Sequence, residues 1–208
     1  MATSRALAVL LTAAACQSSP AVDEASSEIV GGTVDLADDA VVGLTYRARP
    51  CGTAPVATCT GTLIAPRAVL TAAHCVDGES AATLLVFSGP RADGGARVEI
   101  DSIEIHPDFD GLAADLAIVT LAAPLAAAPL PLRRAPLDAA AVGTRVRLVG
   151  YGASEAGAEG IKHEGTARIT QVTAASIVVA PDPALTCNAD SGGPVLIAEE
   201  VAGVVAYG

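Results

Sequence analysis

Aromatic side chains are almost absent from this sequence. Phe, Trp and Tyr make up 2% of its 208 residues, and Trp does not occur. Because 51% of the residues are nevertheless hydrophobic, a core must be built from Val, Leu, Ile and Ala. A chain of this length is typical of one domain, or of two small halves that fold together.

Positive charge is scarce as well. The chain has 12 Lys and Arg residues against 23 Asp and Glu residues, a formal net charge of −11. Nucleic-acid binding needs a basic surface to meet the phosphates, so this balance argues against it. We also find no internal repeat, no phosphate-binding glycine loop and no spacing of metal ligands. The sequence therefore predicts neither a cofactor nor a metal.

The apolar run at the N-terminus is short. Arg5 precedes residues 6–15, a stretch too short to span a bilayer as a helix but suited to an export signal. Three alanines before Cys16 resemble a bacterial lipoprotein signal, although Ala13 stands where such signals usually have Leu. We expect residues 1–16 to be the signal and residues 17–28, which are small and polar, to be a linker or propeptide. Two locations stay open: an outer-membrane lipoprotein anchored through Cys16, or an extracellular protein after plain cleavage.

Five cysteines in an exported chain favour disulfides. If Cys16 carries a lipid, four remain for pairing. They are Cys51, Cys59, Cys75 and Cys187.

Sustained helical periodicity is missing beyond residue 28. Short apolar runs, several of them strictly alternating, are separated by Gly, Pro, Asp and Ala-Pro clusters. These runs predict strands over 40–48, 82–87, 96–105, 116–121, 144–152, 166–172, 176–180, 193–198 and 202–208. The best candidate for a helix is one turn around residues 72–76. Many short strands with few helices predict an all-β sandwich or barrel.

Three fragments carry the residue types of nucleophilic catalysis: LTAAHC with His74, DLAIVTL with Asp115, and CNADSGGP with Ser191. A serine hydroxyl is a weak nucleophile unless a base accepts its proton, and an acid must orient that base. Every histidine precedes Ser191, which excludes the Ser, acid, His order of α/β-hydrolases. An Asp, His, Ser order is formally possible, but nothing around Ser191 resembles the serine segment of subtilisins.

The motifs together resemble the trypsin-like serine peptidases of the chymotrypsin fold. The matching segments are IVGG (29–32), CTGTLIAPRAVLTAAHC (59–75), HPDF (106–109), DLAIVTL (115–121), GYG (150–152), CNADSGGP (187–194) and GVVAYG (203–208). One such motif would be weak evidence, whereas all of them in the family's order are a specific signal. The resemblance implies one peptidase domain over 29–208, two antiparallel six-stranded β-barrels with the site between them, and a protein or peptide substrate.

The resemblance also implies roles for individual residues. His74 is the general base, Asp115 its orienting acid and Ser191 the nucleophile. The backbone N–H groups of Ala189 and Ser191 form the oxyanion hole, and a disulfide joins Cys59 to the cysteine after His74, Cys75.

Substrate-binding positions follow from the same resemblance: Leu185, Thr186, Ala206, Tyr207 and Gly208, the last three as a strand that pairs with the substrate backbone. A trypsin-type pocket has Asp at its base, where this chain has Leu185. We therefore expect an apolar side chain before the scissile bond, because a desolvated cation would lack a counter-charge. Pairing of a substrate cation with Asp182 stays open.

In the family, activation is a cleavage that frees the N-terminus of IVGG. The new ammonium of Ile29 would pair with Asp190, and the required cut after Glu28 points to a separate protease with a preference for glutamate. If Cys16 is lipidated, this cut would release the catalytic domain from the membrane. A Cys16–Cys51 bond would instead keep the propeptide tethered.

Two departures from the family leave a second hypothesis open. Position 189 is normally Gly, and the Cβ of Ala189 penalises conformations that glycine tolerates. Family domains also continue past Gly208 with a strand, a helix and the partner of Cys187, so we expect an incomplete second barrel. The leading hypothesis is an exported serine endopeptidase. The alternative is a catalytically inactive homologue that acts as an anchored binding or scaffold protein.

Overall fold

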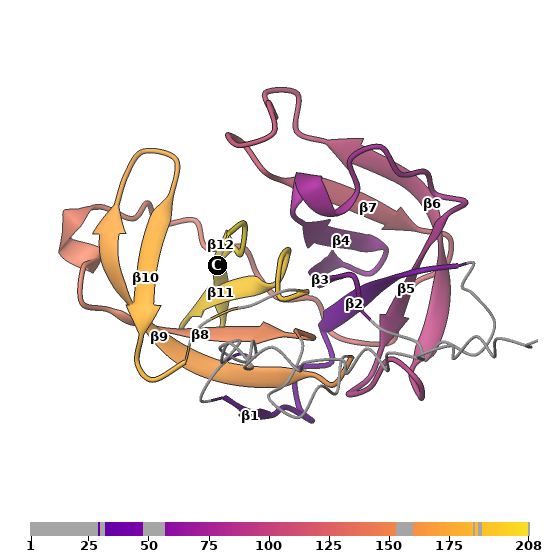
Figure 1. Cartoon of the computed structure of the whole chain (residues 1–208), viewed down its shortest axis with the longest axis horizontal. Coiled ribbons are helices and arrows are strands. Elements are labelled where there is room, and N and C mark those ends of the chain that lie inside the picture. Colours follow the sequence, from indigo (N-terminus) through magenta and orange to yellow (C-terminus); the bar gives the residue numbers. More distant parts are fainter. Residues whose placement is uncertain are drawn as a thin grey trace, which may run out of the picture.

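A computed structural model describes residues 29, 32–47, 57–152, 160–184, 186 and 189–207. This part of the chain is nearly all β, with two halves side by side (Figure 1). The first half is a closed antiparallel barrel in the strand order β2-β3-β4-β7-β6-β5. Its strands are β2 (Val41–Tyr46), β3 (Cys59–Ala65), β4 (Ala68–Thr71), β5 (Leu84–Ser88), β6 (Ala96–Ile105) and β7 (Ala117–Leu121).

The second half is a six-stranded antiparallel sheet in the order β1-β9-β8-β11-β12, with β10 also paired to β9. Its strands are β1 (Thr33–Val34), β8 (Arg145–Gly150), β9 (His163–Val172), β10 (Ile177–Pro181), β11 (Pro194–Ile197) and β12 (Glu200–Val204). Within the described residues this sheet stays open, whereas the first half closes. The all-β, chymotrypsin-like fold expected from the sequence is confirmed, with an incomplete second barrel.

Two single helical turns complete the secondary structure of the described residues. One is η1 (Ala73–Cys75), where the sequence predicts a single turn, and the other is η2 (Ala139–Ala141). The side chain of Asp138 caps η2 by accepting a hydrogen bond from the Ala140 N–H at 2.8 Å. Among the described residues, no helix is long and apolar enough to cross a membrane.

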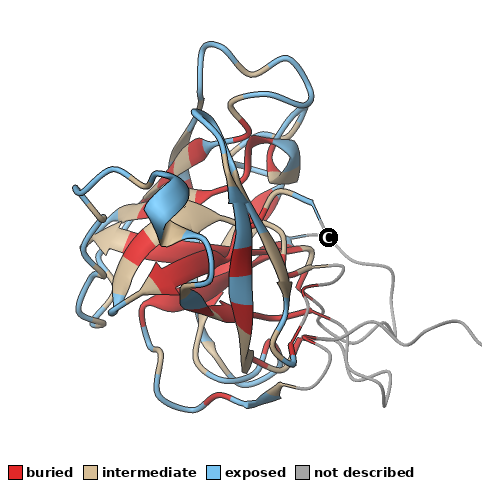
Figure 2. Cartoon of the chain, turned by 90° about the vertical axis from the view of Figure 1, so that its left-hand side faces the viewer, coloured by how far each residue is buried: buried red, intermediate tan, exposed pale blue. Residues whose placement is uncertain are grey.

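Aliphatic side chains fill both halves, as the scarcity of aromatic residues requires. In β7 every second residue is buried, namely Ala117, Val119 and Leu121, because alternate side chains of a strand point to the same face. Figure 2 shows the buried residues gathered along the strands, whereas most of the loops are exposed. Phe87 and Tyr151, from different halves, meet edge to face with ring centroids 4.9 Å apart.

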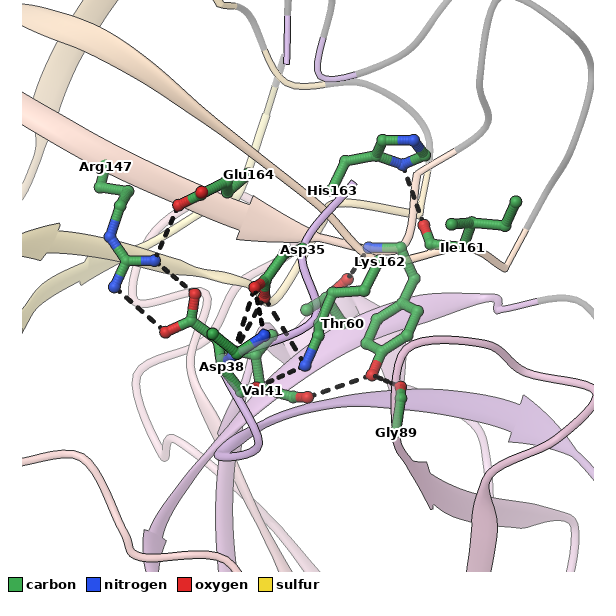
Figure 3. Close-up of polar contacts among 12 residues, drawn as sticks. Asp35, Asp38, Val41, Thr60, Gly89, Arg147, Ile161, Lys162, His163 and Glu164 are labelled. Atoms are coloured by element: carbon green, nitrogen blue, oxygen red, sulfur yellow. Dashed lines mark hydrogen bonds and ion pairs between the residues drawn. The ribbon is translucent and has the colours of Figure 1, made fainter. Parts of the chain in front are cut away.

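A polar network also joins the two halves. Tyr151 donates its hydroxyl proton toward the backbone oxygens of Val41 and Gly89, at 3.1 and 2.6 Å. Lys162, the only lysine in the sequence, is fully buried. Its ammonium donates to the backbone oxygen of Asp38 at 2.6 Å and lies 3.6 Å from the carboxylate of the buried Asp35 (Figure 3). The segment before β2 is therefore fixed to the start of β9.

Next to this lysine, the guanidinium of Arg147 binds several carboxylates. It donates to both carboxylate oxygens of Asp38, and to Glu164 at 3.1 Å (Figure 3). Burial raises the pKa of Asp38, but the hydrogen bond and charge of Arg147 outweigh burial, so the pKa lies below its ordinary value. A lowered pKa means that the native state favours the ionised carboxylate.

This pair should make stability depend on pH. A carboxyl group with a lowered folded-state pKa stabilises the protein above its unfolded-state pKa, about 3.9, and less as pH falls through the folded-state value. We expect Asp38→Asn to lower the free energy of unfolding by about 1–2 kcal/mol at neutral pH. Urea unfolding across a pH series checks this. If the difference in free energy of unfolding between wild type and Asp38→Asn stays constant from about pH 6 to about pH 3, the charge of the Asp38 carboxylate is not the source of that difference.

Candidate active site

His74 and Asp115 are joined by two hydrogen bonds. Nδ1 of His74 lies 2.7 Å from one carboxylate oxygen of Asp115, and the backbone N–H of His74 donates to the other at 2.8 Å. The pairing of Thr71 in β4 with Ala117 in β7 brings the two segments together. The Asp115 side chain is 4% exposed and the His74 side chain 34%. Since an ionised carboxylate can only accept, Nδ1 carries the proton and Nε2 is left as the acceptor.

The turn that holds His74 is cross-linked to the barrel. The expected disulfide between Cys59 and Cys75 is present, with the two Cα atoms 6.0 Å apart. It ties η1 to the start of β3, and Sγ of Cys75 lies 3.7 Å from Nε2 of His74. The cross-link therefore limits how far the imidazole can move with its backbone.

Ser191 lies in a tight loop before β11 that is fastened on two sides. Its backbone oxygen accepts a hydrogen bond from the Thr60 N–H of β3 at 2.8 Å, and Gly192 N–H donates to Val205 at 2.7 Å. A Cβ on Gly192 would lie 2.1 Å from the Thr60 oxygen, and its φ is +84°, so only glycine fits this position. The loop of the second half is thus packed directly on the barrel that carries His74 and Asp115.

The Ser191 hydroxyl makes no hydrogen bond to His74 in the described part of the chain. The two residues are nevertheless neighbours, because Sγ of Cys75 lies 3.6 Å from the backbone oxygen of Ser191 and 3.7 Å from Nε2 of His74. A hydrogen bond between nucleophile and base need not be present before substrate binds.

Ala189 adopts a conformation that normally favours glycine. Its φ is +68°, in the left-handed region, where a Cβ costs roughly 1–2 kcal/mol. The Thr60 hydroxyl donates to the Ala189 oxygen at 2.7 Å. The chain thus holds an alanine, under strain, where the resemblance predicts an oxyanion-hole residue.

Asp190 and Ile29, the residues expected to pair on activation, are both buried in the second half, each 1% exposed. Asp190 accepts a hydrogen bond from the Gly152 N–H at 2.9 Å. Side chains at Gly150 or Gly152 would collide with this carboxylate, since an added Cβ would lie 2.2 or 2.6 Å from one of its oxygens. The GYG motif therefore makes room for Asp190.

Three of the expected substrate-binding residues fall within the described chain: Thr186, which is buried, and Ala206 and Tyr207. Tyr207 is 58% exposed, and its ring stacks on the His74 imidazole with centroids 6.1 Å apart. Desolvation and the nearby acids Asp115 and Asp110 raise the pKa of Tyr207, so its hydroxyl stays protonated and donates to Gly111 at 3.2 Å. Ala206 and Tyr207 follow β12 without forming a strand themselves.

Several expectations lie outside the described residues. They concern Cys16, Glu28, Cys51, Leu185, Cys187 and Gly208.

Asp182, the alternative partner for a substrate cation, lies within the described chain and already binds two arginines. Its carboxylate accepts hydrogen bonds from Arg145 at 3.0 Å and Arg168 at 2.7 Å. The hydrogen bond from Arg145 is the main cause of its lowered pKa.

Sequence reasoning did not single out Thr60, although it contacts both Ala189 and Ser191. Its partners Tyr151 and Ala189 are 91 and 129 positions away, so no local spacing marks them. The other two histidines make local hydrogen bonds to the backbone. His106 accepts from the backbone of Asp108, and His163 donates to that of Ile161.

Comparisons with known proteins agree with this geometry. A barrel and a sheet that meet beside a His–Asp pair and a serine loop define a chymotrypsin-like hydrolase architecture. The family model described as Trypsin matches residues 29–208. The chain therefore belongs to the trypsin family of serine peptidases.

Individual relatives are moderately similar in sequence. The chain is 30% identical over 170 residues to a trypsin of Saccharopolyspora erythraea, covering 72% of this chain and 75% of the relative. It is 27% identical over 210 residues to trypsin iota of Drosophila melanogaster, covering 89% and 80%.

Solved structures share the fold at lower identity. Mouse neuropsin, a serine protease, superposes with a TM-score of 0.69 at 18% identity, covering 85% of this chain and 86% of that one. Human heparin binding protein gives the same TM-score at 20% identity, covering 85% and 84%. At these identities the likeness concerns the fold alone.

Proposed function

We propose that the protein is a serine endopeptidase that cleaves peptide bonds with His74, Asp115 and Ser191. The observation that carries this proposal is the buried Asp115, which accepts two hydrogen bonds from His74. This arrangement fixes the imidazole tautomer and leaves Nε2 free to take a proton. The membership of the trypsin family supports the same reaction.

In the proposed reaction, the Ser191 oxygen attacks the carbonyl carbon of the scissile bond while Nε2 of His74 takes its proton. Asp115 stabilises the resulting imidazolium. The N–H groups of Ala189 and Ser191 stabilise the negative charge that develops on the carbonyl oxygen. The imidazolium then protonates the leaving amine, which gives an acyl-enzyme. Water, activated by His74, attacks this ester and restores the free serine.

A pre-steady-state burst tests the acyl-enzyme. With an activated ester substrate, acylation releases the alcohol before the slower hydrolysis of the ester intermediate. We expect a rapid release of about one equivalent of alcohol per active site. Slow linear release at the same rate in wild type and Ser191→Ala would contradict the proposal. That result would favour the inactive homologue, the alternative for which the strained Ala189 argues.

We also propose that the enzyme is exported and activated by proteolysis. Residues 1–16 would direct export and residues 17–28 would be the propeptide, with Cys16 as the only link to a membrane. A separate protease would cut after Glu28. Burial of both Ile29 and Asp190 in the second half supports their later pairing.

The expected specificity is for small or large apolar side chains before the scissile bond. Leu185 offers no counter-charge, and Asp182 is already paired with Arg145 and Arg168. A lysine or arginine side chain would lose its hydration without compensation. A peptide library should be cleaved chiefly after Leu, Phe, Val or Ala. Cleavage mainly after Arg or Lys would refute this and direct attention back to Asp182.

A further inference from the structure

Thr60 is fully buried where the two halves meet, and each of its polar groups has a partner. Its backbone N–H donates to the backbone oxygen of Ser191 at 2.8 Å. Its backbone oxygen accepts from the Thr71 hydroxyl at 2.7 Å. Its hydroxyl oxygen accepts from the Tyr151 N–H at 3.0 Å and lies 2.7 Å from the oxygen of Ala189.

The direction of these bonds follows from the chemistry of the groups. A backbone N–H can only donate, so the Thr60 oxygen is the acceptor toward Tyr151. The single hydroxyl proton of Thr60 is then free to donate to the Ala189 oxygen, which can only accept. Because the site is buried, both partners would lose their hydrogen bond if the hydroxyl were removed.

These contacts hold the loop that carries Ser191 at two points. The Thr60 side chain binds residue 189 and the Thr60 backbone binds residue 191. The two oxyanion donors of the proposed mechanism are the N–H groups of these same two residues, and the N–H of Ser191 lies between the two anchored carbonyls. Ala189 sits at φ +68°, which its Cβ disfavours, so the loop needs an external restraint that a glycine would not require.

We propose that Thr60 is a positioning residue for the oxyanion hole. Its hydroxyl holds Ala189 in the left-handed conformation and thereby keeps the oxyanion donors in place. The inference rests on the proposed serine-peptidase function and adds a residue that never touches the substrate. It also predicts that the need for Thr60 depends on the side chain at position 189.

A double-mutant cycle tests this dependence, using full-length protein processed to its mature form. Thr60→Val removes the hydroxyl and keeps the shape, and Ala189→Gly removes the strain. In the wild-type background we expect Thr60→Val to lower kcat about 10- to 100-fold with KM changed less than about threefold, since losing one oxyanion donor costs roughly 100- to 1000-fold. In the Ala189→Gly background the same change should lower kcat less than about threefold.

Two control variants separate positioning from general damage. Thr60→Ser restores the hydroxyl and should recover most of the lost kcat. Thr58→Val, two residues earlier, removes a hydroxyl that donates to the Leu44 oxygen at 3.2 Å and should change kcat less than about twofold. Equal losses of kcat from Thr60→Val in the two backgrounds would overturn the inference, and so would a loss confined to KM.

Thermal unfolding gives a readout that does not need activity. The fall in Tm caused by Thr60→Val should be smaller in the Ala189→Gly background than in the wild-type background. If wild type hydrolyses no substrate, the proposed function fails and the thermal cycle alone decides the role of Thr60. Equal falls in Tm would then show that Thr60 does not restrain Ala189.

Discussion

Alanine at either His74 or Ser191 should reduce hydrolysis by roughly 10⁵- to 10⁶-fold, and alanine at both should cost no more than either alone. His74 without Ser191 has no nucleophile to activate, and Ser191 without His74 keeps its proton. The two residues act as one unit, so their losses do not add. The slow activity that remains would come from substrate binding and the oxyanion hole.

Steady-state kinetics of the two single variants and the double variant check this expectation. His163→Ala is the matched control, because His163 is partly buried and bonded to the backbone of Ile161, outside the proposed site. It should retain nearly full kcat. Additive losses in the double variant would show that His74 and Ser191 do not share one mechanism.

Asp190→Asn should lower kcat/KM about 100- to 1000-fold. Asp190 is 1% exposed, and its carboxylate accepts a hydrogen bond from the Gly152 N–H at 2.9 Å. In the proposed active form it also neutralises the ammonium of Ile29. Breaking a buried ion pair costs about 3–5 kcal/mol, enough to leave the neighbouring Ser191 loop disordered. Asp182→Asn is the matched control, because its surface pairs with Arg145 and Arg168 should contribute little.

The same scheme predicts that a chain that cannot be cut before Ile29 stays inactive. Glu28→Gln should remain intact in the presence of a protease that prefers glutamate, and its activity should match that of Asp190→Asn. N-terminal sequencing and intact mass identify which form is present. Full activity in a chain still continuous through Glu28–Ile29 would rule out this activation.

Some strands were predictable because only one of their faces is buried. The run over 96–105 becomes β6 with the expected bounds, since its apolar residues recur at every second position over most of its length. The sequence pattern did not predict β3 or β4. β3 is buried almost throughout, so its sequence shows no alternation. β12 was expected over 202–208 but ends at Val204, because the backbone of Val205 bonds to the loop residues Gly192 and Gly193.

The residues of the proposed active site could be named from the sequence, but the contacts that support them could not. His74 and Asp115 stand in recognisable motifs, and the structure brings them together across β4 and β7. The hydrogen bonds of Thr60 to Ala189 and Ser191 depend on how the barrel packs against the second sheet. No local sequence pattern predicts that packing. The sequence predicts strain at Ala189, because glycine is usual there. The Thr60 hydroxyl that binds the Ala189 oxygen could be identified only from the structure.

A fluorophosphonate probe tests the central claim most directly, because it reacts only with a serine that an active site has made nucleophilic. Protein cut after Glu28 should gain a single phosphonyl group, and peptide mass spectrometry should place it on Ser191. Ser191→Ala should remain unlabelled, and His74→Ala should label far more slowly. Folded, correctly cut wild-type protein that stays unlabelled would contradict the assignment of Ser191 as an activated nucleophile.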